Sequence, residues 1–289
     1  MNIEVSKLKK VYGKKEALKD INLHLSGNKI IGLLGKNGAG KTTFMRILAG
    51  HFRQSKGDIQ INEQPVFNNY EQTKDICFIM ESNNFYEKFS VQEILTISSK
   101  FYPNWDESYA NKLLDIFQLN AKQKIKTLSK GMYSALGIII GLSSNAPITI
   151  FDEPYIGLDA SNRSTFYDLL LQSYQQNPRL IILSTHLIDE VSKLFEEVII
   201  FHEGSVMLHE LSEELEKKHA IIKGRKEEID QYIKNRHVIH ESTILGQKTA
   251  VLFDEEKIDD KRFEVSKLNL QELFVYLTKE RMREIVHSN

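Results

Sequence analysis

The sequence has no long hydrophobic run and almost no cysteine. Its longest apolar stretches, near residues 136–142 and 148–151, are far shorter than the roughly 18 residues that a membrane-spanning helix requires. Residues 1–5 include an acidic side chain and no long apolar segment, which predicts that they are not a signal peptide. Work at a membrane would therefore require another chain as the anchor.

The single cysteine, Cys77, has no partner for an internal disulfide. Its apolar neighbours predict a buried, unreactive thiol, and we expect a reducing compartment such as the cytoplasm. The 38 basic and 39 acidic residues give a formal net charge of −1 and are interspersed along the sequence. Because this balance provides no basic field, no nucleic-acid partner is expected.

What the sequence does contain is a complete phosphate-binding loop at residues 35–42, Gly-Lys-Asn-Gly-Ala-Gly-Lys-Thr. A buried-strand pattern at residues 29–34 precedes the loop, and a helical pattern at residues 42–49 follows it. The glycines let backbone N–H groups point at phosphate oxygens, at the positive end of the helix. We therefore predict that the loop binds a nucleoside triphosphate. The residues assigned to this contact are Gly35, Asn37, Gly38, Ala39, Gly40, Lys41, Thr42 and Thr43.

Residues 148–154 form an apolar, β-rich run that ends in two acids, Asp152 and Glu153. Both acids therefore come at the carboxyl end of a core strand, where ligands bind in open α/β sheets. Lys41 is expected to reach the β- and γ-phosphates, and the Thr42 hydroxyl to ligate Mg²⁺. Asp152 is predicted to hold Mg²⁺ opposite Thr42, while Glu153 orients or deprotonates an attacking water.

Another apolar run, at residues 180–183, leads into Ser184, Thr185 and His186 at the same edge of the predicted sheet. His186 is predicted to contact the γ-phosphate. A lone histidine at a strand end is more often a polar surface residue, so this assignment depends on the other motifs. Together they predict a catalytic set of Glu153, His186 and Lys41.

In their order along residues 2–205, these motifs resemble the ATP-binding cassette (ABC) ATPases. Tyr12 matches the aromatic residue that stacks on adenine in that family, although a tyrosine in a polar loop is otherwise a surface residue. Residues 128–132, Leu-Ser-Lys-Gly-Met, align with the family signature, which is usually Leu-Ser-Gly-Gly-Gln. The resemblance implies that Ser129 and Gly131 bind the γ-phosphate held by a second subunit.

The resemblance also implies a dimer, because one chain carries only one cassette. Residues 157–159 match the loop through which such dimers sense each other, with Asp159 as the cross-subunit contact. An ordinary turn after a strand is the alternative for this segment. The second ABC ATPase is either another copy of the chain or a related protein.

Three residues depart from the family pattern. Glu81 stands where the family usually has glutamine; a carboxylate there can still ligate Mg²⁺, but it adds negative charge beside the phosphates. Lys130 replaces a signature glycine, and Met132 replaces the polar residue that usually follows. We expect slow but real ATP hydrolysis.

The expected fold is α/β: a P-loop NTPase of the ABC type, with a mixed sheet core, over residues 1–208. Residues 85–142 are helix-rich, with a capping-box spacing from Ser90 to Glu93, and match the helical subdomain of the family. Aromatic residues in this region suit either a docking surface for a membrane subunit or core packing. They are Phe85, Tyr86, Phe89, Phe101, Tyr102 and Trp105.

Residues 209–289 alternate strand-like and helical stretches without a catalytic constellation, which predicts a small α+β extension. It resembles the C-terminal extension of ATPases from bacterial drug, antibiotic and peptide exporters. A role in dimer contact or regulation is expected for it.

The resemblance implies the ATP-hydrolysing subunit of a bacterial ABC exporter, with ATP and Mg²⁺ as cofactors and a separate membrane-spanning permease as partner. The chain would then lie on the inner face of the cell membrane. The implied cargo is a drug, an antibiotic or an amphipathic peptide, and the similarity extends to the staphylococcal exporters of phenol-soluble modulins. The alternatives are a soluble ABC ATPase acting on ribosomes or nucleic acid, and a nucleotide-dependent regulator that barely hydrolyses ATP.

Overall fold

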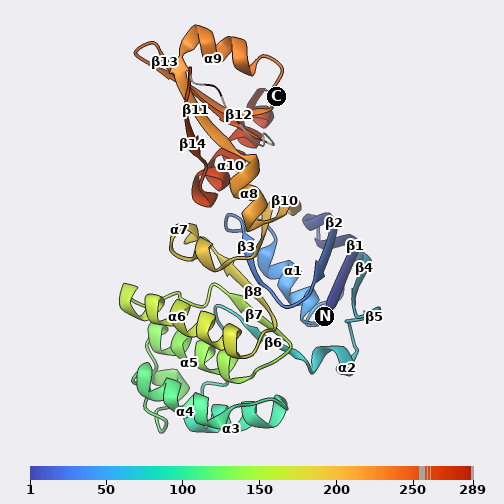
Figure 1. Ribbon diagram of the computed structural model, residues 1–289. Coiled ribbons are helices and arrows are strands. Elements are labelled where there is room, and N and C mark those ends of the chain that lie inside the picture. Colours follow the sequence, from blue (N-terminus) through green and yellow to red (C-terminus); the bar gives the residue numbers. More distant parts are fainter. Residues whose placement is uncertain (254–257, 259, 261, 288–289) are drawn as a thin grey trace. The chain divides into compact units, whose positions relative to one another are not determined.

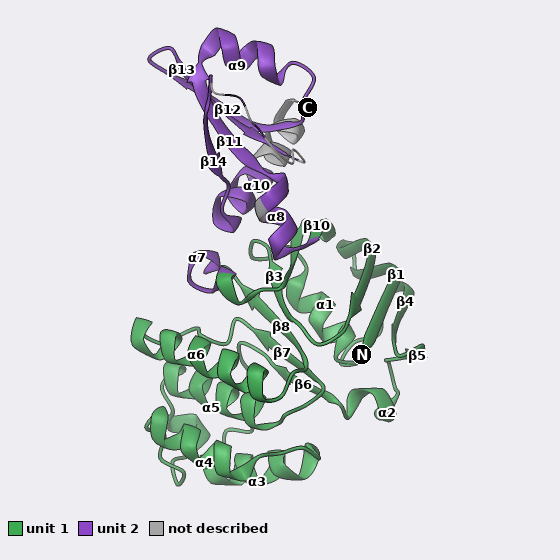
Figure 2. Cartoon of the chain, viewed as in Figure 1, with its two compact units in different colours: residues 1–186, 193–209 green, residues 187–192, 210–289 purple. Residues whose placement is uncertain are grey.

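The computed structural model describes residues 1–253, 258, 260 and 262–287. The chain divides into two compact units (Figure 2). The first comprises residues 1–186 and 193–209, and the second comprises residues 187–192 and 210–289. All the sequence motifs for nucleotide binding, from Tyr12 to His186, therefore lie in the first unit.

Two sheets form the framework of the first unit (Figure 1). Their strands are β1 (Asn2–Tyr12), β2 (Lys15–Ser26), β3 (Ile30–Leu34), β4 (Lys56–Ile61), β5 (Gln64–Pro65), β6 (Ile76–Ile79), β7 (Ile148–Asp152), β8 (Leu180–Thr185), β9 (Glu197–His202) and β10 (Ser205–Leu211). The helices are α1 (Lys41–Leu48), α2 (Tyr70–Thr73), α3 (Val91–Phe101), α4 (Glu107–Ile116), α5 (Lys130–Ser143) and α6 (Ala160–Gln176), with 3₁₀ turns at Ile125–Thr127 and Ser192–Leu194. The strand and the helix expected on either side of the phosphate loop are thus present as β3 and α1.

The larger sheet has six strands in the order β10-β9-β3-β8-β7-β6, and β3, β6, β7, β8 and β9 run parallel. Every residue of β3, β7 and β8 is buried. Figure 1 shows the reason: α1 lies on one side of these strands, and α5 and α6 lie on the other. Strands covered on both faces are apolar throughout, which explains the continuous hydrophobic runs in the sequence.

Helix α1 lies between the parallel strands and the smaller, four-stranded sheet of order β2-β1-β4-β5. Its apolar residues Phe44, Met45, Ile47 and Leu48 share one buried cluster with residues of both sheets. The Phe44 and Phe201 rings, for example, lie 5.4 Å apart between centroids. Burial of each such side chain contributes about 1.5–3 kcal/mol, so this cluster fixes the helix that begins at the phosphate loop.

The region of residues 85–142 contains α3, α4 and most of α5, as the helical pattern predicts. Ser90 caps α3 by the expected capping box: its N–H donates to Glu93 over 2.6 Å, and its hydroxyl accepts from the Glu93 N–H over 3.2 Å. The aromatic residues of this region are partly exposed and partly packed. Tyr86 and Phe101 are exposed, whereas the Phe85 ring packs 5.0 Å from that of Tyr133.

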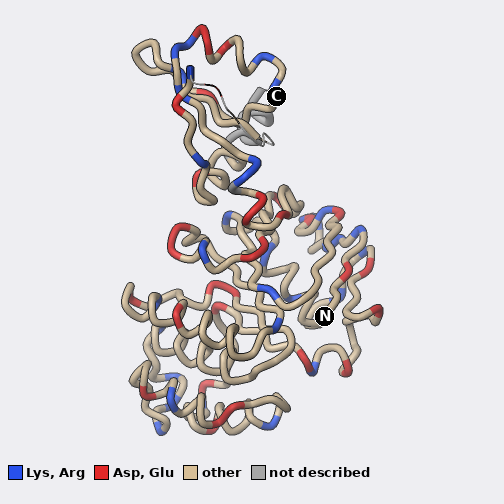
Figure 3. The backbone as a smooth tube through the Cα atoms, in the orientation of Figure 1, with Lys and Arg blue, Asp and Glu red and all other residues tan. Residues whose placement is uncertain are grey.

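Cys77 is fully buried, and this burial raises the pKa of its thiol, so the expected inert core thiol is confirmed. Basic and acidic residues are interspersed along the backbone of both units (Figure 3). Among the residues that the structure describes, no helix is both long and apolar enough to span a bilayer.

The second unit has a four-stranded antiparallel sheet of order β12-β13-β11-β14. Its elements are α7 (Ile188–Val191), α8 (Ser212–Lys218), β11 (Ala220–Arg225), α9 (Lys226–Ile233), β12 (Val238–Ile244), β13 (Gln247–Leu252), β14 (Glu264–Lys267) and α10 (Leu270–His287). Ile229 and Ile233 of α9 pack with Ile222, Leu252 and Phe263 in its core. The α+β character expected for this part of the chain is therefore observed.

Candidate functional site

The carboxyl ends of three neighbouring strands meet at one edge of the six-stranded sheet. Backbone pairing places the last residue of β3 opposite Thr185 of β8, and Asp152 of β7 opposite Ser184 of β8. Because these strands run parallel, the segments that follow them start side by side. The phosphate loop follows β3, while β7 and β8 lead into Glu153 and His186.

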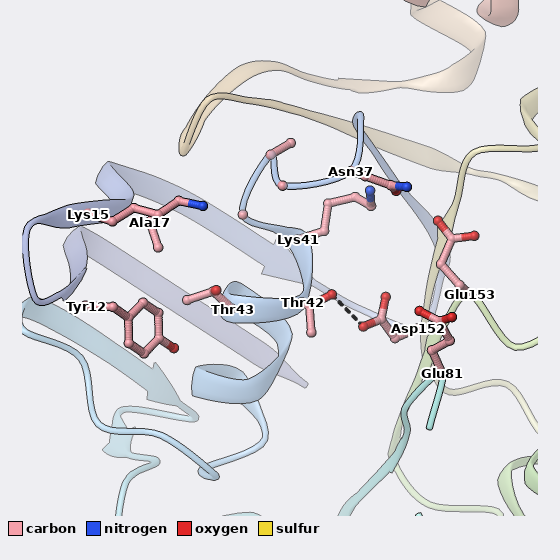
Figure 4. A pocket seen from close by; sticks show the side chains of 13 residues that line it. Tyr12, Lys15, Ala17, Asn37, Lys41, Thr42, Thr43, Glu81, Asp152 and Glu153 are labelled. Carbon is pink, nitrogen blue, oxygen red and sulfur yellow. Dashed lines mark hydrogen bonds between the residues drawn. The ribbon is translucent and has the colours of Figure 1, made fainter. Parts of the chain in front are cut away.

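The phosphate loop borders a pocket of about 370 Å³, a size typical of small-molecule sites. Figure 4 shows Tyr12 and Lys15 at one end of this pocket and the acids Glu81, Asp152 and Glu153 at the other. The residues that line it are Tyr12, Lys15, Ala17, Asn37, Gly38, Ala39, Gly40, Lys41, Thr42, Thr43, Glu81, Asp152 and Glu153. The structure therefore brings most of the predicted nucleotide and metal residues together.

The shape of the loop requires glycine at its junction with α1. Gly40 has φ +110°, a left-handed conformation that residues with a side chain rarely adopt. A Cβ atom at this position would lie 2.9 Å from the carbonyl oxygen of Ala17. The loop backbone can therefore lie against β2 and continue directly into the first turn of α1, where free N–H groups favour an anion.

Lys41 is buried beside the loop, near Asp152 at the end of β7 and Glu153 directly after it. Its ammonium donates to the carbonyl oxygen of Gly35 over 2.5 Å and to that of Lys36 over 3.4 Å. Burial lowers the pKa of Lys41, while the charges of Glu153 and Asp152 oppose that shift. Gly35 itself does not line the pocket, but its carbonyl oxygen holds the lysine at the pocket wall.

Thr42 and Asp152, the two predicted metal ligands, are in direct contact. The Thr42 hydroxyl donates to Asp152 Oδ2 over 2.7 Å, and Figure 4 shows this bond from α1 to the end of β7. Burial raises the pKa of Asp152, while the Thr42 bond lowers it, so a nearby cation would favour the ionised form. Hydroxyl and carboxylate oxygens are ligands that Mg²⁺ accepts.

The donor set fits Mg²⁺ only in part. Thr42 and Asp152 bond each other directly, and the Glu81 carboxylate lies at the same pocket wall. Among the described residues, no cluster of three or more His, Cys, Asp or Glu side chains could hold a metal ion. An ion at this place would therefore take its other ligands from water and from phosphate oxygens, which is usual for Mg²⁺.

Glu153 and His186 form a pair at the edge of the pocket. His186 Nδ1 lies 2.7 Å from Glu153 Oε2. An ionised carboxylate can only accept, so the ring carries its proton on Nδ1 here and its Nε2 is the atom left for other contacts. Glu153 is buried, whereas about half of the His186 side chain is exposed.

Comparison with known proteins adds to this geometry. The sequence matches the ABC transporter family over residues 18–156. It is 30% identical to an uncharacterized ABC transporter ATP-binding protein of Methanocaldococcus jannaschii, across 94% of this chain and 98% of the relative. The chain belongs to the ABC transporter ATP-binding proteins. It is thus an ABC ATPase, as the order of the motifs predicts.

This ABC ATPase is also 28% identical to the bacitracin transport ATP-binding protein BcrA of Bacillus licheniformis, across 95% of this chain and 96% of that protein. Its fold is similar to that of a dimeric ATP-binding cassette solved with ADP and Pi, with a TM-score of 0.64 at 22% identity. That match covers 73% of this chain and 98% of the solved one. The likeness to the solved cassette concerns the fold.

In this ABC ATPase, the ring of Tyr12 stands at the pocket wall with 43% of the residue exposed. Phe52 packs edge-on against the ring, with centroids 6.3 Å apart, and the Lys10 ammonium lies 5.1 Å from the ring centroid. Phe52 and Lys10 therefore fix the position of the ring against the protein. An exposed aromatic face in such a position can stack on a planar ligand.

Ser129, Gly131 and Asp159 do not line the pocket of their own cassette. Ser129 caps α5 by accepting from the Met132 N–H over 3.2 Å, and Asp159 caps α6 by accepting from the Asn162 N–H over 2.8 Å. Within one chain these polar groups therefore act as helix caps.

Gly131 has a packing reason to be glycine that the sequence does not reveal. A Cβ atom there would lie 2.5 Å from the carbonyl oxygen of Gly157. A Cβ atom on Gly157, whose φ is +89°, would in turn lie 2.9 Å from the backbone nitrogen of Gly131 and 2.9 Å from Lys130 Cγ. The signature segment and the loop before α6 are thus in backbone contact within one cassette, so a shift in either one would displace the other.

Two of the departures from the family pattern form an ion pair with each other. Lys130 Nζ lies 3.6 Å from Glu81 Oε1, and both side chains are half-exposed. From the sequence, each was interpreted as a separate departure from the family pattern. Because the residues lie about fifty positions apart, no local pattern could have predicted this pair.

Sequence reasoning also missed Lys15, Ala17 and Tyr155. Lys15 and Ala17 belong to β2 and enter the pocket only because the phosphate loop folds against that strand. Tyr155 contacts both Glu153 and His186. Its place directly after the Asp-Glu-Pro sequence was a usable signal, since a residue in that turn remains close to the acids.

Proposed function

We propose that this ABC ATPase hydrolyses ATP to power an exporter whose permease is a separate membrane-spanning chain. The observation that carries the proposal is the Glu153–His186 pair beside the contact between Thr42 and Asp152. A base, a metal position and a buried lysine at one sheet edge are the parts that phosphoryl transfer to water needs.

In the proposed reaction, Lys41 turns its ammonium from the loop carbonyls to the β- and γ-phosphates. Thr42, Asp152 and Glu81 hold Mg²⁺, which when bound supplies positive charge to the phosphate oxygens. Glu153 accepts a proton from the attacking water, and His186 donates from Nε2 to the γ-phosphate when its ring is protonated. Tyr12 stacks on the adenine ring.

A second cassette completes the site in this proposal. Ser129 and Gly131 lie at the N-terminus of α5, where free backbone N–H groups favour the γ-phosphate of a facing subunit. Asp159 contacts the partner from the start of α6. The solved dimeric cassette with ADP and Pi supports this arrangement, because the fold of this chain is similar to it.

The permease and the cargo are inferred from relatives. Similarity to the bacitracin transport ATP-binding protein along 95% of this chain supports a drug, an antibiotic or an amphipathic peptide as cargo. Phenol-soluble modulins are a narrower prediction within that class. The chain is then held at the inner face of the membrane through its permease.

The experiment is to tag Glu153→Gln, which should keep ATP bound, and to purify it from detergent-solubilised membranes with ATP and Mg²⁺. The double variant Lys41→Met/Glu153→Gln, which lacks the phosphate-binding lysine, is the matched control. We expect one multi-span protein to copurify with the single variant and to be depleted with the double variant.

Other outcomes would redirect the proposal. Recovery with ribosomes or nucleic-acid-bound proteins, and with no multi-span partner, would instead favour the soluble ABC ATPases. Full hydrolysis by Glu153→Gln would contradict the assignment of the base. Tight ATP binding by a wild-type protein that does not turn over, alone or with its permease, would favour a nucleotide-dependent regulator.

A further inference from the structure

The phenol group of Tyr155 lies at the centre of the Glu153–His186 pair. Its hydroxyl is 2.5 Å from Glu153 Oε2, 2.6 Å from Thr185 Oγ1 and 3.5 Å from His186 Nδ1. The backbone N–H of His186 donates to the same hydroxyl oxygen over 3.1 Å. Tyr155 is only 2% exposed, so water does not replace these partners. One side chain therefore connects the segments that follow β7 and β8.

The hydrogen-bonding capacity of the phenol is fully used. It has one proton and two lone pairs, and the ionised Glu153 carboxylate can only accept. The phenol proton therefore goes to Glu153, while the His186 N–H and the Thr185 hydroxyl donate to the phenol oxygen. Burial, together with the charge of Glu153, raises the pKa of Tyr155, so the phenol remains a neutral donor at physiological pH.

Two donors converge on one oxygen of Glu153 and leave the other unbonded. Tyr155 and His186 both bond Oε2, whereas Oε1 is buried and has no hydrogen-bond partner among the described residues. A buried carboxylate oxygen without a partner is costly, so it marks an atom meant for a ligand or a water. The two bonds to Oε2 fix which oxygen is left to take a proton.

The backbone at Glu153 also requires support. Its φ of +52° lies in the left-handed region, which costs a residue with a side chain of the order of 1–3 kcal/mol. A strained backbone persists where surrounding bonds hold it, and the Glu153 N–H donates to Ser184 over 3.3 Å. Tyr155, two residues further on, holds the side-chain end of the same residue.

We propose that Tyr155 is a positioning residue for hydrolysis. It orients the Glu153 carboxylate so that Oε1 faces the attacking water, and it keeps His186 Nδ1 within hydrogen-bond distance of Glu153 Oε2. The inference rests on the proposed ATP hydrolysis. Tyr155 acts through its two neighbours and does not line the nucleotide pocket.

The test compares Tyr155→Phe with Tyr167→Phe in the full-length protein. Both changes remove one hydroxyl from a buried tyrosine; Tyr167 lies on α6, where it packs against Phe166. For Tyr155→Phe we expect kcat to fall by roughly 10-fold or more, as for the loss of a hydrogen bond to a charged group, with KM close to wild type. The unfolding temperature should also fall, because the buried partners of the hydroxyl lose their hydrogen bonds, so it is not used to decide the role of Tyr155. The control should retain both kcat and KM.

A second readout does not depend on hydrolysis. Long-range ¹H–¹⁵N spectra of the histidine rings, with His186→Ala to identify the His186 signals, should show a proton on Nδ1 in the wild type. In Tyr155→Phe the carboxylate is free to rotate, so the His186 ring should show a mixture of the two tautomers. A merely structural role would lower the unfolding temperature but leave the proton of His186 on Nδ1 in the variant as in the wild type.

The outcomes separate the two proposals. Wild-type kcat in Tyr155→Phe, or His186 ring signals identical in the two proteins, would overturn the role of Tyr155 alone. A wild-type chain that lacks ATPase activity, with its permease as well as without it, would overturn the proposed function. The His186 spectra would still decide the positioning role in that case.

Discussion

Each unit contains a buried lysine, and the two are held in opposite ways. Lys41 in the first unit is 6% exposed, and Lys248 in the second is 7% exposed. Lys41 donates to backbone carbonyl oxygens, and burial lowers its pKa. Burial also disfavours the charge of Lys248, but its bonds to Asp230 and Glu241 outweigh this and raise the pKa.

The difference shows how a lysine that stabilises the fold can be distinguished from a lysine that binds a ligand. Lys248 is neutralised by two carboxylates of its own unit, so it contributes to folding and has little left for a ligand. The acids nearest Lys41 are differently engaged, since Asp152 accepts from Thr42, and Glu153 from His186 and Tyr155. The lysine in the first unit therefore remains available to a negatively charged ligand.

The largest effect is expected from Glu153→Gln in the first unit. An amide cannot accept the proton of water, so ATP hydrolysis should fall by about 10²–10⁴-fold while nucleotide binding persists. Asp230→Asn makes the same chemical change beside Lys248 and should leave the rate within about two-fold of wild type. Phosphate release and nucleotide binding by fluorescence measure the two effects. Equal loss of hydrolysis in both variants would erase the contrast between the units.

The two lysines can be compared directly by Lys41→Met and Lys248→Met. Lys41→Met should lower kcat/KM for ATP by about 10²-fold, since it removes a cation aimed at developing charge. Lys248→Met should leave ATP hydrolysis intact and destabilise the second unit by about 1 kcal/mol, because its half-exposed partners remain hydrated. Steady-state kinetics and urea unfolding provide the two measurements.

The effect of Lys248→Met on the free energy of unfolding should depend on pH in one direction. Since folding raises the pKa of Lys248, its stabilisation is complete below the ordinary value of 10.5 and is lost as the pH rises through the raised value. The stability difference between wild type and Lys248→Met should therefore be constant near neutral pH. A difference that already shrinks between neutral pH and pH 9 would contradict the ion-pair interpretation.

A smaller effect is expected from Glu81→Gln at the wall of the pocket. An amide is a weaker Mg²⁺ ligand than a carboxylate, so half-maximal hydrolysis should require roughly two- to five-fold more Mg²⁺. Lys130→Gln breaks the same half-exposed ion pair and should change the unfolding temperature little. If Glu81→Gln altered neither the rate nor the Mg²⁺ dependence, the metal role proposed for Glu81 would be wrong.

The smallest effect on stability is expected at the helix caps. Each unit has a helix whose N-terminus is capped with the help of a glutamate. The N–H and hydroxyl of Ser90, together with Lys124, lower the pKa of Glu93 to about 2. Its contribution to stability is therefore present above the unfolded value near 4.5 and is lost as the pH falls toward 2. Thermal unfolding of Glu93→Gln should approach that of wild type over this range. Glu272→Gln provides the comparison for the Asn269 cap of α10 in the second unit.

Much of the first unit was predictable because its signals are local. The runs that became β3, β7 and β8 are continuous and apolar, and the phosphate loop requires glycine wherever it occurs. Those features also predicted the sheet edge at which Asp152, Glu153 and His186 meet. The second unit offered weaker signals, although strands and helices do alternate along it as its sequence predicted.

The sequence by itself determined the loop, the strands and the acids that follow them, since each depends on neighbours along the chain. Only the tertiary structure decided that Lys130 pairs with Glu81, that Gly131 touches Gly157, and that Tyr155 bonds the Glu153–His186 pair. Apart from the bond between Tyr155 and Glu153, these contacts join segments far apart in sequence, and their formation depends on how the parallel strands and the helices beside them pack. A propensity or a spacing describes one segment, so it carries no information about the segment that will lie opposite.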